Sequence, residues 1–290
     1  MVACDSPTSH VEKERTVSVP DLAAFDKRAF IANFLRPNRP VVYKAHASEW
    51  KAVEKWSPDF FLKTHGSTEV PLSGRPPIRL SDYIRSLKKG GAARALPYLR
   101  NIWLGRYFPD LVSDTRVPEM AEPNWLTHRL VRPFIPRESV PWFEFFLSAP
   151  RTRFPFVHQD ACSTHAWLLQ VYGEKKVWLW PPDVRAPRHG ETKLRVSPGQ
   201  NLGALFPNHV PATTVLKPGD ILFIPANWWH TAESQTISIT LSGNFVNETN
   251  WHAFFASYFL GEERAALDED ARMKLSKISD KVIADYANAS

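Results

Sequence analysis

The chain has 290 residues, of which 43% are hydrophobic and 23% charged, and its formal net charge at pH 7 is +6. This length and composition can supply the core of one main domain, and no apolar run approaches the roughly 20 residues that cross a bilayer. The polar start of the chain lacks the apolar segment of a secretory signal, so we expect no membrane association and an intracellular, cytoplasmic location. The two cysteines, Cys4 and Cys162, do not indicate a disulfide scaffold.

The first third of the chain carries helical signals. Residues 19–35 place apolar side chains at helical spacing, which predicts a helix there. Ser81 precedes the helix-like residues 82–89 and is a candidate N-cap, because its hydroxyl can accept from the free N–H groups of the first turn.

Two pairs of strand-like segments are joined by tight-turn signals. Residues 165–172 and 175–180 are rich in β-favouring and large apolar residues, and Gly173-Glu174 between them suits a turn. The second pair is residues 213–216 and 221–225. Residues 217–220 between them read Lys-Pro-Gly-Asp, where proline suits the second and glycine the third position of a type II turn. The sequence therefore predicts two β-hairpins.

A later segment has the period of a half-buried strand. Ile237, Ile239 and Leu241 alternate with serine and threonine until Gly243 interrupts the pattern. Short strands separated by turns can close into a small barrel or roll. We therefore predict a mainly β fold with flanking helices.

Three side chains that can bind a metal lie at the ends of two strand-like runs. His158 and Asp160 are two residues apart, and alternate residues of a strand point to the same face. His230 ends the apolar run ILFIPANWWH. Two imidazoles and one carboxylate on one side of an ion form the facial triad of non-haem Fe(II) oxygenases, which leaves coordination positions open. The sequence predicts a metal centre here, with a chance His-x-Asp pair as the alternative.

These motifs resemble a known family. The stretches HQDACSTHAWLLQVYGEKKVWLWPP, PGDILFIPANWWH and ISITLSGNFVN resemble the JmjC and cupin-8-like hydroxylases, which are Fe(II)- and 2-oxoglutarate-dependent oxygenases. The upstream segments NRPVVYKAHASEW, KWSPDFFLK and PYLRNIWL resemble the lead-in segments of those enzymes, so roughly residues 20 to 250 are covered. The resemblance implies a double-stranded β-helix (jelly roll) core with helical N-terminal and C-terminal additions.

The resemblance also implies roles for single residues. His158, Asp160 and His230 would bind the iron, and Lys175 would hold the far carboxylate of 2-oxoglutarate. A cation suits that task because a buried diacid is costly unless each carboxylate is met by a positive group. Lys176 is the rival, since neighbouring residues of a strand face opposite ways and only one of the two can point into the barrel.

Three further residues are cosubstrate contacts by resemblance. Tyr98 would donate its hydroxyl to the same carboxylate, and Asn244 would face the iron; a core tyrosine and a turn asparagine are the alternatives. Many members carry threonine or serine three residues before the first iron ligand, where this chain has Pro155. His165 stands near where a polar cosubstrate contact is often found, with a hydrogen-bonded structural histidine as its alternative.

The resemblance implies an enzyme that uses Fe(II), 2-oxoglutarate and O2 to hydroxylate an unactivated C–H bond, giving succinate and CO2. We favour a protein or peptide side chain, or an amino-acid-like small molecule, as substrate. Nucleic acid is less favoured, because the basic residues are scattered and form no stripe with interleaved aromatics. The alternatives are a tRNA-base hydroxylase or N-demethylase of the same family, a cupin-type metalloenzyme that does not use 2-oxoglutarate, and a scaffold protein without turnover.

The expected organisation has three parts. Residues 1–15 form a mobile tail, 16–250 a JmjC/cupin-like catalytic domain, and 251–290 a C-terminal helical extension. The extension reads as two helices, over 251–260 and from 262 to about 287. The first of them carries an aromatic face, which is large enough to need burial. It is formed by Trp251, Phe254, Phe255, Tyr258 and Phe259. A homodimer through these helices and packing against the same chain are both open.

Overall fold

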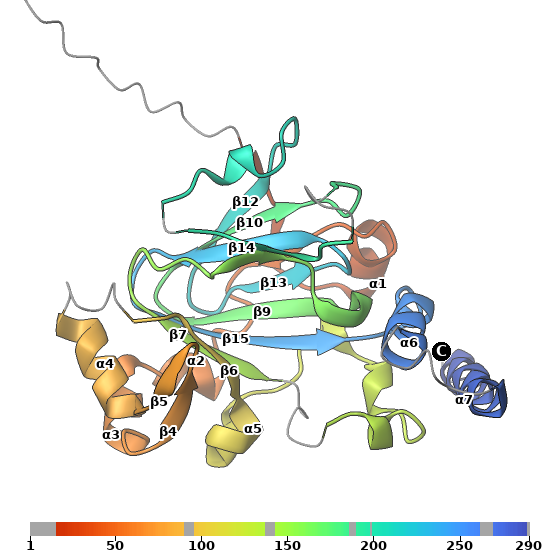
Figure 1. Ribbon diagram of the computed structural model, residues 1–290, viewed down its shortest axis with the longest axis horizontal. Helices are drawn as coiled ribbons and strands as arrows, with labels where there is room; N and C mark the ends of the chain where they lie inside the picture. The colour runs from red at the N-terminus through yellow and green to blue at the C-terminus, as the bar shows by residue number, and fades with distance from the viewer. Residues whose placement is uncertain are drawn as a thin grey trace, which may run out of the picture.

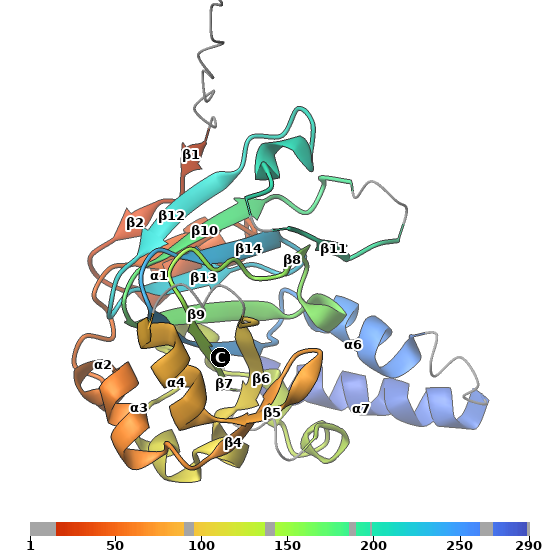
Figure 2. The ribbon, with the colours of Figure 1, turned by 60° about the vertical axis from the view of Figure 1, so that its left-hand side comes forward.

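The computed structural model describes residues 16–89, 96–136, 143–185, 190–197, 199–261 and 269–288. Two β-sheets lie over one another and form a roll, with helices beneath the larger sheet and at one end (Figure 1, Figure 2). The predicted mobile tail lies outside the described residues. The prediction of a mainly β jelly roll with flanking helices is confirmed.

The smaller sheet has six strands in the order β1-β12-β10-β14-β8-β11. They are Val17–Ser18 (β1), Phe156–His158 (β8), Lys175–Trp180 (β10), Lys193–Arg195 (β11), Ala212–Leu216 (β12) and Trp229–Ser234 (β14). His230 on β14 stands directly opposite His158 on the antiparallel β8. The register of this sheet therefore brings the two imidazoles together.

The larger sheet has seven strands in the order β2-β3-β13-β9-β15-β7-β6. They are Asp21–Leu22 (β2), Val41–Tyr43 (β3), Leu99–Trp103 (β6), Glu144–Ser148 (β7), His165–Tyr172 (β9), Ile221–Ile224 (β13) and Ser238–Phe245 (β15). A separate two-stranded sheet pairs Glu69–Leu72 (β4) with Arg75–Arg79 (β5).

Both hairpin predictions are wrong. β9 belongs to the larger sheet and β10 to the smaller one, and β12 and β13 are divided in the same way. The turn at Gly173 and the turn at residues 217–220 therefore carry the chain from one sheet to the other. Turn residues specify where the chain reverses, but they do not specify which strand pairs with which. Lys175 of β10 is instead paired with Leu216 of β12.

Alternate residues of β15 face the inside and the outside of the roll. Ser242 and Asn244 line the interior pocket, whereas Ile239 and Leu241 belong to the core beneath the sheet. The strand continues through Gly243 to Phe245, so the glycine does not interrupt it as predicted. The period-2 prediction for the preceding residues is otherwise confirmed.

Short helices cover the outer face of the larger sheet (Figure 2). They are Lys27–Phe30 (α1), Lys51–Lys55 (α2), Pro58–Thr64 (α3), Leu80–Lys89 (α4) and Leu104–Tyr107 (α5). Their apolar side chains form one core with the outward residues of the strands. Phe61 of α3, for example, packs on Phe145 of β7 with ring centroids 4.9 Å apart.

Two helix starts differ from the predictions. The helix predicted over residues 19–35 begins only at Lys27, because residues 21–22 join the larger sheet and Asp26 caps the helix by accepting from the Ala29 N–H at 2.6 Å. α4 begins at Leu80, so Ser81 lies inside the helix and does not cap it.

The C-terminal helices, Trp251–Leu260 (α6) and Glu269–Ala287 (α7), lie at the end of the roll to which β15 points (Figure 1). The aromatic side chains of α6 are buried within the same chain, in a cluster with residues 125–135 and α7. Trp125 stacks on Tyr286 of α7 with centroids 4.9 Å apart. The aromatic face of α6, which had suggested a homodimer, is therefore covered by packing within the same chain.

Among the helices of the described residues, none combines the length and apolar character needed to span a bilayer.

Gly173→Ala should destabilise the fold, because the turn between the sheets is tight. Gly173 has φ +72°, and an added Cβ would lie 2.0 Å from the Ile237 carbonyl oxygen. Gly74 is a matched control, since its φ is +71° and nothing lies within 4 Å of an added Cβ. The left-handed backbone alone should cost each variant roughly 1–2 kcal/mol of unfolding free energy. In urea denaturation, Gly173→Ala should lose at least twice as much unfolding free energy as Gly74→Ala. Equal losses in Gly173→Ala and Gly74→Ala would contradict this packing.

Candidate active site

Three metal-binding side chains meet inside the roll. Nε2 of His158 lies 3.6 Å, and Nε2 of His230 3.8 Å, from Oδ1 of Asp160. Ligands held at about 2.0–2.2 Å from one ion stand roughly 3 Å or more apart, so this spacing suits a shared ion. Within the described part of the chain, this is the one group of three or more His, Cys, Asp or Glu residues that can hold a metal.

Asp160 is positioned by a turn and not by a strand. β8 ends at His158, and Asp160 precedes the 3-10 turn Ala161–Ser163. Asn244 on β15 donates from Nδ2 to Oδ2 of Asp160 at 3.3 Å and to the Thr164 hydroxyl at 3.0 Å. One carboxylate oxygen therefore faces the histidines while the other is held by the larger sheet.

Both imidazoles are suited to bind a metal through Nε2. Nδ1 of His230 donates to the Trp228 carbonyl at 3.0 Å, which leaves the Nε2 lone pair free for an ion. Burial is the largest cause that holds the pKa of His158 well below its ordinary value, and the neighbouring His230 and Lys193 lower it further. Neutral imidazole is the form that binds metal. Two such imidazoles and one carboxylate form the donor set of a non-haem Fe(II) centre, so the residues present fit that ion.

A buried lysine shares the pocket with this triad. Lys175 on β10 is 1% exposed, and its Nζ donates to the Tyr98 hydroxyl at 2.6 Å and to the Thr240 hydroxyl. No carboxylate of the described residues forms an ion pair with it, and burial lowers the pKa of Lys175 from 10.5 to about 7. A buried cation with only neutral partners is costly until an anion meets it. Lys175 therefore marks a site for an anionic group.

The two adjacent lysines lie on opposite faces of β10. Lys175 lines the interior pocket, whereas Nζ of Lys176 lies 4.6 Å from the ring centroid of Trp178 on the outer side of the sheet. Only Lys175 points towards the triad, as the alternation of the strand requires.

Thr240 contacts the buried lysine, and it was not identified from the sequence. Its hydroxyl accepts from Lys175 and donates to Oε1 of Gln170 at 3.0 Å. The amide of Gln170 is held in turn by Ser238, which accepts from Nε2 at 2.8 Å. The alternation along β15 was the available signal, because it places Ser238 and Thr240 on the inward face with Asn244.

One pocket of about 220 Å³ connects the lysine to the triad. Among its lining residues are Tyr98, Glu144, Phe146, Phe154, His158, Asp160, Leu168, Lys175, His230 and Asn244. They come from both sheets, so the pocket depends on closure of the roll. Tyr98 and Asn244 both line this pocket.

His165 does not line this pocket. Its Nδ1 accepts from the Ala226 N–H at 2.9 Å, and its Nε2 is paired with the Thr249 hydroxyl at 2.8 Å. The ring packs on Phe223 and Phe245. The predicted cosubstrate contact therefore has no support in the geometry, and the alternative of a hydrogen-bonded structural histidine describes the residue.

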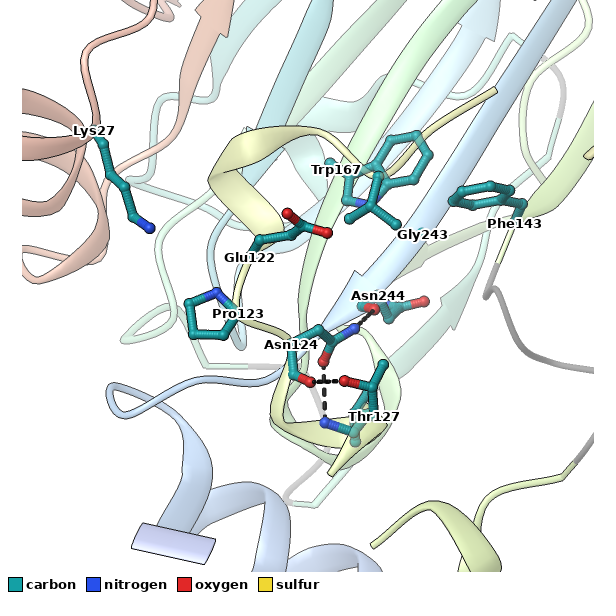
Figure 3. A pocket seen from close by; sticks show the side chains of 11 residues that line it. Lys27, Glu122, Pro123, Asn124, Thr127, Phe143, Trp167, Gly243 and Asn244 are labelled. Carbon is teal, nitrogen blue, oxygen red and sulfur yellow. Dashed lines mark hydrogen bonds between the residues drawn. The ribbon is translucent and has the colours of Figure 1, made fainter. Parts of the chain in front are cut away.

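A second hollow, of about 510 Å³, lies behind Asn244 (Figure 3). Trp167, Phe143 and Gly243 lie along one side of it, and none of the three metal-binding residues lines it. Asn124 donates from Nδ2 to the Asn244 carbonyl at 3.2 Å. Asn124 therefore holds the main chain of β15 beside this hollow, and none of the three metal-binding residues faces it.

Asp160→Ala should strongly weaken metal binding while leaving the fold intact, because it removes the anionic ligand and no apolar packing. Titration with Co(II), followed by visible absorption and calorimetry, should show affinity reduced by roughly 100-fold or more. Asp183→Ala is a matched control, since Asp183 is exposed. Unchanged Co(II) affinity in Asp160→Ala would contradict the assignment.

The chain matches a family model described as a cupin-like domain over residues 27–257. It is similar to the arginine-specific demethylase JMJ22 of Arabidopsis thaliana, at 26% identity over 83% of this chain and 47% of that protein. It is similar to the lysine-specific demethylase JMJ21 of Arabidopsis thaliana, at 23% identity over 83% of this chain and 26% of that protein. With the human 2-oxoglutarate and iron-dependent oxygenase JMJD4 the identity is 27%, over 88% of this chain and 67% of that protein.

The chain thus spans about half of the first of these relatives and about a quarter of the second. The family match, by contrast, covers well over half of this chain and includes all three metal-binding residues. The protein belongs to the cupin-like domain family.

Proposed function

We propose that the protein is a 2-oxoglutarate-dependent Fe(II) oxygenase that modifies a side chain of a protein or peptide. Bound Fe(II), together with 2-oxoglutarate and O2, supplies the oxidising power that hydroxylates a C–H bond and leaves succinate and CO2. The observation that carries the proposal is that an uncompensated buried lysine shares one pocket with the His-Asp-His triad. The metal and the lysine together provide the two positive groups that a diacid needs.

Each residue of the pocket has a separate task under this proposal. The triad holds the ion on one side, and Asn244 keeps the Asp160 carboxylate in place. Lys175 binds the far carboxylate of 2-oxoglutarate, with Tyr98 as a second donor. The apolar residues Phe146, Phe154 and Leu168, which line the same pocket, keep water away from the reacting groups.

The pocket size favours a small reacting group. Its volume of about 220 Å³ lies below the roughly 300–1,000 Å³ of pockets that enclose drug-sized ligands. A diacid and one extended side chain suit it better than a diacid and a nucleotide base, which makes a tRNA-base hydroxylase the weaker alternative. The names of two relatives specify arginine and lysine demethylases, so we take a basic side chain as the substrate class. N-demethylation would be the same oxidation applied to a methyl group.

Substitution of Lys175 distinguishes this proposal from the alternative of a metalloenzyme that does not use 2-oxoglutarate. Lys175→Ala should raise the KM for 2-oxoglutarate by roughly 10- to 100-fold, because it removes a charge-assisted hydrogen bond. Lys176→Ala is the control and should leave it unchanged. The assay is succinate formation from 2-oxoglutarate with Fe(II), ascorbate and O2. The opposite ranking of the two variants, or metal-dependent turnover indifferent to 2-oxoglutarate, would contradict the proposal.

Binding of 2-oxoglutarate should weaken as the pH rises above 7. The pKa of Lys175 is about 7 in the free protein, so below that pH the ammonium is present and binding takes up no proton. Above it the amine is neutral, and binding must bring in a proton at a penalty of about tenfold in affinity per pH unit. Calorimetry of the Co(II) protein in buffers of different ionisation enthalpy should detect uptake of close to one proton at about pH 8.5. Lys175→Met should lose this uptake, and its absence in the unmodified protein would contradict the assignment.

A further inference from the structure

A second carboxylate faces the metal pocket and has no task in the proposed chemistry. Glu144, the first residue of β7, lines the pocket together with the triad. Its partner in the neighbouring strand β15 is Ser242. Along that strand Ser242 lies between Thr240, which contacts Lys175, and Asn244, which contacts Asp160. Glu144 therefore lies at the level between the anion-binding lysine and the metal ligands.

The backbone holds this carboxylate in place. The Asn101 N–H donates to Oε1 of Glu144 at 2.5 Å. Asn101 has φ +61° and lies where the pairing of β6 with β7 shifts register, between Leu99 and Ile102. Asparagine tolerates the left-handed conformation better than most residues, but such a position persists only when its surroundings fix it. The irregularity in β6 thus aims one N–H at one oxygen of Glu144.

The other oxygen of Glu144 is left for a ligand. Among the residues that the structure describes, no group besides Asn101 donates to this carboxylate. Arg100 also lines the pocket, but it forms no ion pair with Glu144, and its guanidinium lies 5.4 Å from the ring centroid of Phe156. Burial raises the pKa of Glu144 to about 7; the charge of Asp160 adds to this rise, while the Asn101 hydrogen bond and the charge of Arg100 oppose it. A carboxylate in this position is stabilised by an incoming cation.

We propose that Glu144 determines substrate specificity by accepting hydrogen bonds from the ammonium or guanidinium group of a lysine or arginine side chain that enters the pocket. This inference rests on the proposed function and assigns its substrate class to a residue of this chain. The oxygen fixed by Asn101 orients the carboxylate, and the free oxygen accepts from the ligand. A neutral side chain of the same length leaves that oxygen unpaired and is rejected.

The basic residues at the pocket raise one competing outcome. Nζ of Lys193 lies 4.1 Å from the ring centroid of Phe156, the same ring that Arg100 contacts. An acidic side chain would be attracted to these two cations. Glu144, however, lies on β7 at the level between Lys175 and the triad. An acidic side chain that entered there beside the diacid would meet the carboxylates of Glu144 and Asp160. The position of Glu144 therefore favours a cationic side chain.

The test uses the 290-residue chain loaded with Fe(II) and 2-oxoglutarate without O2, so that binding is measured without turnover. The probes are capped tripeptides with a central lysine, arginine, norleucine, citrulline or glutamate, titrated by calorimetry. The lysine and arginine peptides should bind about 10- to 100-fold more tightly than their neutral counterparts, as expected for a hydrogen bond to a charged group. Glu144→Gln should abolish the preference, since its amide oxygen keeps the Asn101 hydrogen bond but carries no charge.

Glu248→Gln is the matched control, because Glu248 is exposed and lies outside the pocket, and it should keep the preference. Tighter binding of the glutamate peptide, equal binding of all peptides, or a lysine and arginine preference that survives in Glu144→Gln would overturn the inference. The proposed function is tested separately by succinate formation in the unmodified protein. Its failure is therefore distinguishable from a failure of peptide selectivity.

Discussion

The ammonium group of Lys175 is the constraint on which the interior of this roll depends. It is buried with two hydroxyl partners and, among the described residues, no countercharge. A chain selected only for stability would place an apolar side chain there, because a buried charge without a partner is costly. The interior is therefore organised to receive an anion, and the adjacent triad is organised to receive a cation. With a metal ion in the triad, a molecule that carries a carboxylate at each end would meet both positive groups.

This arrangement follows from the way in which the chain crosses between sheets. Gly173 turns the chain from β9 to β10 with a left-handed backbone, and Lys175 follows two residues later on the inward face. The smaller sheet supplies Lys175 and both histidines, while the larger sheet supplies Thr240 and Asn244. Neither sheet holds the complete site alone. Closure of the roll is therefore a requirement of the chemistry as well as of the core.

The parts of the site that follow from local alternation could be predicted from the sequence. Which of Lys175 and Lys176 faces the pocket is of this kind, because a strand has a fixed period of two. The His-x-Asp spacing also indicated the metal site, but a turn after β8, and not strand alternation, brings Asp160 towards His158. Strand pairing could not be predicted in the same way, since a Gly or Pro-Gly turn looks alike in a hairpin and in a connection between sheets. Glu144 also carried no signal: a single glutamate at the start of a strand becomes distinctive only when the pairing of β7 with β15 places it in the pocket and the register shift in β6 aims the Asn101 N–H at it.

Two other outcomes depended on contacts between distant segments. His165 looked like a cosubstrate contact, but the main chain at Ala226 and the side chain of Thr249 engage both of its nitrogens. The aromatic face of α6 looked available for a second copy, but residues 125–135 and α7 cover it. Residues 125–135 form short turns with no regular apolar period, so nothing in their sequence indicated that they pack there.

The most direct test of the central claim is a crystal structure of the protein with Mn(II) and 2-oxoglutarate, in which anomalous scattering locates the metal. We expect one Mn(II) ion about 2.0–2.2 Å from Nε2 of His158, Nε2 of His230 and the carboxylate of Asp160, with one end of the diacid on the ion and the other on Lys175. An ion placed away from the triad, or a diacid that leaves Lys175 without an anionic partner, would contradict it.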